Sequence, residues 1–195
     1  MATRDEILAR VRRNQPAPVA LPALPSSDTP ASGLADRFRA AVVRMGGKVV
    51  DAPADGDRTA LVRRLHPEAK VFCSATAEVS GNRALDARTK PSALDDIDVG
   101  IVRAALGVAE TGSVWLTEKE LKVSALGFLS QHLVVLLDPA RIVGNLHDAY
   151  RDRARFETGY GIFMTGPSAT ADIEGVLIHG AQGIRTLTVV LDRPR

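Results

Sequence analysis

The sequence has little cysteine, few aromatic side chains and almost no net charge, and each shortage excludes a class of protein. Cys73 is the only cysteine, so this chain cannot form an internal disulfide. The usual four-thiolate ligation of an iron–sulfur cluster cannot come from this chain alone either, and we expect no cofactor on it. A single cysteine within an apolar run is typical of a small buried hydrophobic residue.

Aromatic residues make up 4% of the chain, so the core must depend on Val, Leu, Ile and Ala, which favours a sheet covered by helices. The net charge of +2 is too small for the electrostatic footprint of a nucleic-acid-binding protein. No apolar run approaches the ~18 residues of a membrane span. Residues 1–14 also lack the apolar region of a signal peptide. We therefore expect a cytoplasmic protein with no nucleic-acid or membrane partner.

Several catalytic motifs are also missing. The sequence contains no P-loop, no G-x-G-x-x-G, no nucleophile elbow and no Cys/His zinc pattern. The four histidines show no metal-ligand spacing, so no metal site is expected and structural roles are the simplest interpretation. These absences argue against the common nucleotidases, dehydrogenases and serine hydrolases.

Three regions follow one another along the chain. Residues 1–13 carry apolar side chains on one helical face and predict an amphipathic helix. Residues 14–31 are rich in proline and predict an extended linker. The helix predicted in residues 1–13 is too short to be stable alone in water, so we expect it to dock on its own domain, on a second subunit of a homo-oligomer, or on another partner. The compact domain occupies residues 32–195.

Alternating strands and helices are predicted within the compact domain. Apolar runs predict strands at 48–50, 69–74, 99–102, 113–116, 132–137, 161–164 and 187–191. Helical spacing predicts helices at 34–45, 57–65, 121–129, 139–155 and 169–179, with a short helical or irregular piece at 104–108. Residues 75–94 give no clear prediction. The repeated strand–helix–strand units predict an α/β fold, with a mostly parallel sheet and helices on both faces.

A Gly-Pro turn follows the predicted strand at 161–164. Gly166 permits a turn closed to other residues, and the turn continues through Pro167 to Ser168. Ser168 or Thr170 could cap the predicted helix, and Asp172 suits the positive end of its dipole. Because helix N-termini at the carboxyl ends of strands offer N–H groups to anions, these residues predict a ligand-binding site. A capped helix without a ligand is the alternative.

A second polar turn lies between two apolar runs. Glu110 is a candidate general acid or base if burial raises its pKa, and Asp98 is a second candidate. Thr111, Ser113 and the Gly112 amide could hold an oxyanion. A hairpin with its own turn hydrogen bonds is the alternative interpretation. If both turns bind one ligand, we expect them to share a crevice at the carboxyl edge of the sheet, with Asp98 nearby.

Taken together, residues 98–101, 109–114 and 166–174, with His132 at the start of its apolar strand, resemble the lactate utilization protein C family, the LUD domain. The resemblance covers residues from about 34 to 192. It implies a fold similar to the sugar-phosphate isomerase and CoA-transferase group. It also implies a role in bacterial lactate use beside iron–sulfur partner proteins that oxidise L-lactate to pyruvate. Residues 181–184 depart from the family pattern, and we assign that loop no role.

The sequence is compatible with three hypotheses about function. The resemblance favours an accessory or binding component of an L-lactate utilization system. The alternatives are a stand-alone enzyme acting on a phosphorylated or carboxylated metabolite, and a plain interaction module. Fold alone does not decide among them.

Overall fold

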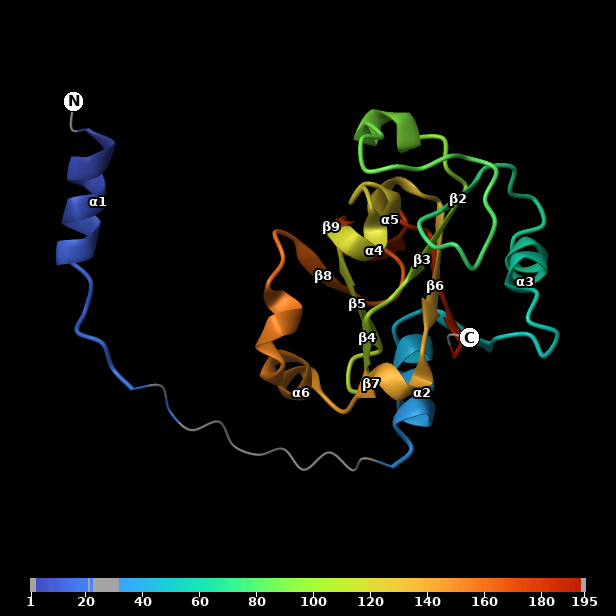
Figure 1. Ribbon diagram of the computed structural model, residues 1–195, viewed down its shortest axis with the longest axis horizontal. Helices are drawn as coiled ribbons and strands as arrows, with labels where there is room; N and C mark the ends of the chain where they lie inside the picture. The colour runs from blue at the N-terminus through green and yellow to red at the C-terminus, as the bar shows by residue number, and fades with distance from the viewer. Residues whose placement is uncertain (1–2, 21, 23–31, 194–195) are drawn as a thin grey trace.

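The computed structural model describes residues 3–20, 22 and 32–193 (Figure 1). Helix α1 (Arg4–Arg13) begins at a capping box, in which the Glu6 amide donates to Thr3 Oγ1 and the Thr3 amide donates to the Glu6 carboxylate. None of its residues is buried, and it lies within the range 1–13 for which an amphipathic helix was predicted. Residues 14–20 and 22 of the predicted linker form neither helix nor strand, and the other linker residues lie outside the described ones.

Five parallel strands form the central sheet, in the order β1-β11-β6-β3-β2. Their bounds are β1 (Lys48–Asp51), β2 (Phe72–Ser74), β3 (Val99–Arg103), β6 (His132–Leu137) and β11 (Thr186–Leu191). His132 pairs with Val99 on one side and with Thr186 on the other, so these three strands begin at the same level. The predicted mostly parallel sheet is confirmed.

A second sheet of four strands has the order β7-β4-β5-β8 and is mainly antiparallel. Its strands are β4 (Leu106–Val108), β5 (Ser113–Thr117), β7 (Ile142–Val143) and β8 (Gly161–Met164). Strands were predicted near β5 and β8. Strand β7 was not predicted, since it has two residues and lies inside the expected helix 139–155, and β4 lies where a helical or irregular piece was expected.

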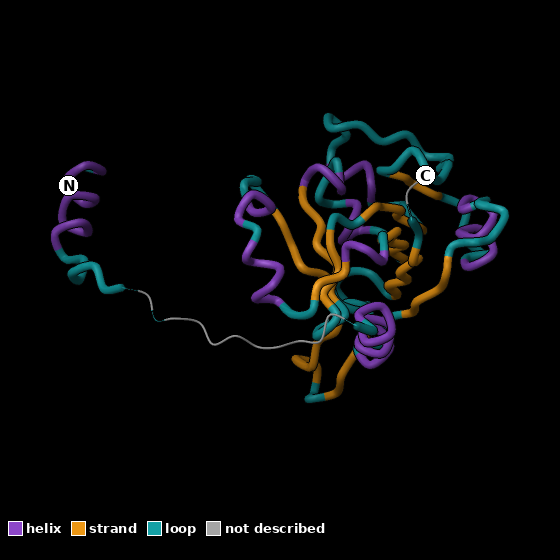
Figure 2. The backbone as a smooth tube through the Cα atoms, turned by 60° about the horizontal axis from the view of Figure 1, so that its bottom comes forward, coloured by secondary structure: helices purple, strands orange, loops and turns teal. Residues whose placement is uncertain are grey.

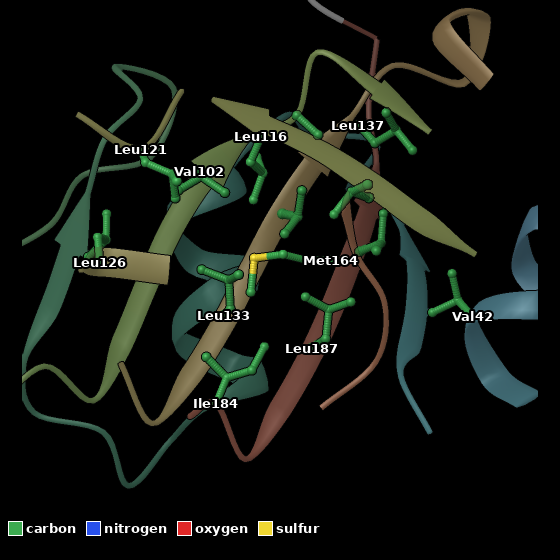
Figure 3. Close-up of a cluster of buried hydrophobic side chains, with 14 of the residues drawn as sticks. Val42, Val102, Leu116, Leu121, Leu126, Leu133, Leu137, Met164, Ile184 and Leu187 are labelled. Atoms are coloured by element: carbon green, nitrogen blue, oxygen red, sulfur yellow. The ribbon is translucent and has the colours of Figure 1, made fainter. Parts of the chain in front are cut away.

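The two sheets pack face to face through the largest hydrophobic cluster. Alternate side chains of β6 point to opposite faces, as a strand's pleat requires. Leu133 and Leu137 join Leu116 of β5 and Met164 of β8 between the sheets (Figure 3). Val134, from the same strand, packs with helix α3 (Arg58–Leu65) on the other face of the parallel sheet. Burial on both faces explains why β6 reads as a continuous apolar run.

Helices cover the two outer faces of this pair of sheets (Figures 1 and 2). Helix α3 (Arg58–Leu65) packs on the parallel sheet, and α6 (Leu146–Arg151) contacts β4 and β7 of the second sheet. Helix α2 (Leu34–Arg44) buries Phe38 and Val42 in the core between the sheets. The remaining short helices are α4 (Glu118–Leu121), α5 (Leu126–Leu129), η1 (Pro91–Leu94), η2 (Pro139–Arg141) and η3 (Arg153–Phe156). The expected coverage by helices is therefore partly replaced by a second sheet.

The helix predicted at 169–179 is wrong. This segment forms a hairpin of β9 (Ala169–Ile173) and β10 (Val176–His179). Glu174 and Gly175 form its two-residue turn, and both have positive φ, at 54° and 72°. Positive φ at both central residues is the geometry of a type I′ turn, which matches the twist of paired strands. The helices predicted at 121–129 and 139–155 are likewise divided into shorter elements.

Residues 75–94, whose structure was not predicted, form a long loop anchored on β2. The Phe72 amide donates to Asn82 Oδ1 at 2.8 Å, and Asn82 Nδ2 donates to the Lys70 carbonyl at 2.7 Å. This loop also places Glu78 near the carboxyl ends of the parallel strands. Within residues 3–20, 22 and 32–193, no helix has the length and hydropathy needed to span a membrane.

Candidate functional site

Charged side chains converge at the carboxyl ends of the parallel strands. Arg103 is the last residue of β3, and Asp192 immediately follows β11. Asp192 is 2% exposed and accepts hydrogen bonds from Arg58 Nε at 2.8 Å and Nη2 at 2.7 Å. Arg103 contacts both Asp192 and Glu78. Two arginines and two carboxylates thus form one network of charge-assisted hydrogen bonds.

The network holds the Asp192 carboxylate ionised. Burial alone would raise the pKa of Asp192, but hydrogen bonds from Arg58 and Arg103 outweigh it and lower the pKa below its ordinary value. The same carboxylates raise the pKa of both arginines. Arg103 is therefore a fixed cation, restrained on two sides.

A cleft of about 750 Å³, called the carboxyl-edge cleft below, opens beside this network. Strand β3 contributes Arg103, helix α4 contributes Lys119 and Glu120, and the segment after β6 contributes Asp138 and Arg141. In α/β proteins with parallel sheets, ligands bind outside the carboxyl ends of the strands, and this cleft lies at that edge.

The two carboxylates that line the cleft are already engaged by local structure. Glu120 accepts from the Thr117 amide at 2.8 Å and from the Thr117 hydroxyl at 2.6 Å. Asp138 accepts from the Ala140 amide at 3.0 Å. Lys119 and Arg141 are exposed, and neither has a carboxylate partner within the described part of the chain. The cleft can therefore offer two free cations to a small anion.

The two turns singled out in the sequence do meet. Strand β5 pairs with β8 so that Val114 lies opposite Met164, which brings the start of one strand to the end of the other. Ser113 Oγ bonds to Thr165 Oγ1 and lies 2.7 Å from Thr111 Oγ1. The predicted proximity is confirmed, but it occurs at one edge of the second sheet and not at the carboxyl edge of the parallel sheet.

Close packing with helix α2 explains the glycines of these turns. A Cβ at Gly112 would lie 2.5 Å from the Val42 amide nitrogen, and one at Gly166 would lie 2.1 Å from the Met45 carbonyl oxygen. Both glycines also have positive φ, at 69° and 64°. The end of α2 is the chain that approaches these backbones. Gly166 also lines a cleft of about 260 Å³ with Pro167 and Ser168, so ligand binding there stays a prediction.

The predicted helix N-terminus behind Pro167 does not exist. Ser168 precedes strand β9, and its hydroxyl donates to the Gln182 carbonyl at 3.0 Å. Asp172 is exposed on the hairpin, and its amide donates to Thr170 Oγ1 at 3.3 Å. Anion binding by a helix terminus at this point is therefore excluded. Ligand binding by these residues in another form stays a prediction.

The two carboxylates suggested as general acids or bases lie apart and have structural partners. Glu110 is exposed, and its carboxylate accepts from the Leu146 amide at the start of α6 at 3.2 Å. Asp98 precedes β3, at the amino end of the parallel sheet, and lines another cleft. Backbone amides of Val71 and Lys70 lower the pKa of Asp98. The cleft that Asp98 lines contains no residue of the two turns.

Comparison with known proteins assigns this fold to a family. The sequence profile of the LUD domain matches residues 82–191, more than half of the chain. The chain belongs to the LUD domain family. This agrees with the resemblance seen in residues 98–101, 109–114 and 166–174, all of which lie within the match.

Two curated relatives align with this LUD domain over 102 residues at 30% identity. One is an uncharacterized protein of Neisseria meningitidis serogroup B (strain ATCC BAA-335 / MC58), aligned with 51% of this chain. The other is the lactate utilization protein C of Shouchella clausii (strain KSM-K16), aligned with 49% of this chain. Each alignment covers 44% of the relative, so the chain matches less than half the length of either.

A solved structure supports the architecture of the LUD domain. The crystal structure of a DUF162 family protein from Deinococcus radiodurans superposes with a TM-score of 0.60. The superposition covers 86% of this chain and 99% of that one, at 17% sequence identity. At this identity the likeness concerns the fold alone.

Sequence reasoning missed the charged residues at the carboxyl edge of the LUD domain. Arg103, Lys119, Arg141 and Asp192 are spread over 90 positions and belong to no short motif. One signal was available, because Arg103 and Asp192 directly end or follow two predicted parallel strands. Charged residues at such positions meet at one edge of a parallel sheet.

Proposed function

We propose that this chain is the binding component of an L-lactate utilization system and holds a small carboxylate in the carboxyl-edge cleft. The observation that carries the proposal is the 30% identity to a lactate utilization protein C. The cleft supports it, since Lys119 and Arg141 are free cations beside the fixed guanidinium of Arg103. Lactate and pyruvate each present one carboxylate, which suits such a site.

Iron–sulfur proteins are the proposed partners, because the oxidation of lactate needs an electron acceptor that this chain does not supply. Cys73 is buried, and burial raises the pKa of its thiol, which disfavours the thiolate that binds metals. We therefore propose that this chain carries no cofactor of its own and that the clusters belong to its partners. Electron transfer would then take place on those proteins.

A growth experiment tests the proposed pathway. Deleting the gene is expected to prevent growth on L-lactate and to leave growth on pyruvate intact, because the chain acts before pyruvate is formed. Affinity purification of the chromosomally tagged chain is expected to recover proteins with bound iron and sulfide. Normal growth of the deletion strain on L-lactate would reject the pathway, and retained carboxylate binding would then favour a stand-alone small-molecule enzyme.

Substitutions in the cleft test the proposed site separately. Lys119→Gln and Arg141→Gln are each expected to weaken the binding of L-lactate or pyruvate about tenfold, the effect of losing one charge-assisted hydrogen bond. Isothermal titration calorimetry measures the change. Both side chains are exposed, so the melting temperature without ligand should stay the same.

Arg64→Gln provides the matched control. Arg64 is an exposed arginine on α3 that does not line the carboxyl-edge cleft. Its replacement removes the same charge from the protein and should leave the affinity unchanged. Equal losses in all three variants would indicate a general charge effect and would contradict the proposed site.

A further inference from the structure

A second cleft lies at the amino ends of the parallel strands, at the opposite edge of the sheet. Its volume is about 370 Å³. His66 follows helix α3, His132 begins β6, and Arg185 immediately precedes β11. Asp98 precedes β3 and also lines the cleft. This amino-edge cleft shares no lining residue with the carboxyl-edge cleft.

The two histidines contact each other inside the amino-edge cleft. Their ring centroids are 4.7 Å apart, at an angle of 31°. His132 Nδ1 lies 2.8 Å from Thr186 Oγ1, which orients that ring. His66 Nε2 is buried and has no hydrogen-bond partner among the described residues. A buried polar atom without a partner destabilises the protein, so this nitrogen favours a ligand that would supply a partner.

Both imidazoles are neutral at physiological pH. Burial, the neighbouring His132 and Lys48 lower the pKa of His66 to about 4. Burial is also the main cause that lowers the pKa of His132, and the charges of Arg185 and Lys48 lower it further. The carboxylate of Asp98 acts in the opposite direction and raises it. The cations around the pair therefore outweigh the carboxylate that faces it.

The two carboxylates that line this cleft, those of Asp98 and Glu68, do not pair with Arg185, so its guanidinium can bind a further anion. Asp98 Oδ2 already accepts from the amides of Lys70 and Val71, at 2.7 and 2.8 Å. Glu68 is exposed at the rim. Arg185 is exposed as well and has no carboxylate partner in the part of the chain that the structure describes.

We propose that the amino-edge cleft is a second binding site, for a small oxyanion held by Arg185 and by the two imidazoles. The guanidinium would hold the charged oxygens, and His66 Nε2 would gain the partner that it lacks. An anion near the pair favours the protonated imidazole, so binding is expected to raise the pKa of His66. The chemistry fits a carboxylate or a phosphate, and the site does not depend on the proposed role in lactate use.

Nuclear magnetic resonance of the histidine side chains tests the site on the full chain. Titration with sodium phosphate, and separately with sodium L-lactate, is expected to shift the resonances of His66 and His132 until they saturate. At saturation the pKa of His66 should rise by about one unit or more, since an opposite charge at close range has that effect. The salt whose anion binds with the higher affinity shows whether the site prefers a phosphate or a carboxylate.

Variants and a salt control make the outcome decisive. Arg185→Gln is expected to weaken the stronger oxyanion about tenfold, whereas Lys119→Gln in the other cleft should leave its affinity unchanged. Circular dichroism confirms that each variant is folded. The proposal is overturned if neither salt shifts the two histidines at millimolar concentrations. It is also overturned if sodium chloride shifts them equally, or if Arg185→Gln binds as tightly as the natural chain.

Discussion

Replacing Asp192 by alanine is expected to lower the free energy of unfolding by about 3–5 kcal/mol, the effect of breaking a buried ion network. Asp192 is 2% exposed, and its side chain joins Arg58 to Arg103. Without it, the two guanidiniums would face each other with Glu78 as their remaining carboxylate. Denaturation in urea measures the loss, and a change below about 1 kcal/mol would mean that water replaces the carboxylate at little cost.

An exposed ion pair supplies the control for this variant. Arg39 and Asp51 also form a salt bridge, but the Asp51 side chain is 72% exposed. Asp51→Ala should cost less than about 1 kcal/mol, because water and salt screen such pairs. The two aspartates thus differ in burial and share the same type of partner.

The pH dependence of stability provides a second reading of Asp192. Its pKa is lower in the folded protein than in the unfolded chain, so its stabilisation is fully present above the unfolded pKa of about 3.9. The stabilisation is lost as the pH falls through the folded pKa. In Asp192→Asn this part of the acid sensitivity should disappear.

Replacing Gly166 by valine is expected to destabilise the domain by about 3 kcal/mol or more, whether or not any ligand binds. Its φ of 64° costs an ordinary residue about 1–2 kcal/mol. The added Cβ would also lie 2.1 Å from the Met45 carbonyl oxygen, and such overpacking costs about 1–3 kcal/mol. A fall in melting temperature without ligand, measured by calorimetry, would confirm this origin.

Gly175→Val separates the two contributions. Gly175 has a φ of 72° and no heavy atom within 4 Å of an added Cβ. Its replacement therefore tests the backbone strain alone and should cost about 1–2 kcal/mol. If Gly166→Val were as mild as Gly175→Val, the contact with α2 would have to be looser than it is in the structure.

Elements with a strong periodic pattern were predictable from the sequence. Strand β6 is a run of apolar residues buried on both faces, and α2 repeats its apolar side chains at helical spacing before two glycines. Tertiary pairing decided the elements that were missed. Strand β7 has two residues, too few for any period, and it exists because it pairs with β4.

The hairpin of β9 and β10 shows why one prediction failed. Ser168 or Thr170 could cap a helix behind the Gly-Pro turn, and Asp172 suits the positive end of a helix dipole, so a helix was predicted. The deciding residues are Glu174 and Gly175, whose positive φ values reverse the chain. A glutamate rarely adopts a positive φ, so the residue type at position 174 did not indicate a turn.

The candidate site was less predictable than the fold. The polar turns at Ser113 and Gly166 were selected for their composition, and their proximity was predicted correctly. Packing against α2 explains the glycines of these turns. The cations of the carboxyl-edge cleft, such as Lys119 and Arg141, look like ordinary surface residues in the sequence. Only the arrangement of the strands brings them together.

Strand β6 sets the spacing between the two edges of the parallel sheet. Its six residues run from His132 at one edge to Leu137 at the other, a length of about 20 Å at 3.3 Å per residue. That length is about twice the Debye length at physiological ionic strength, about 8 Å. Two like-charged small molecules, one at each end of the strand, would therefore repel each other only weakly. The domain has room to carry both at the same time.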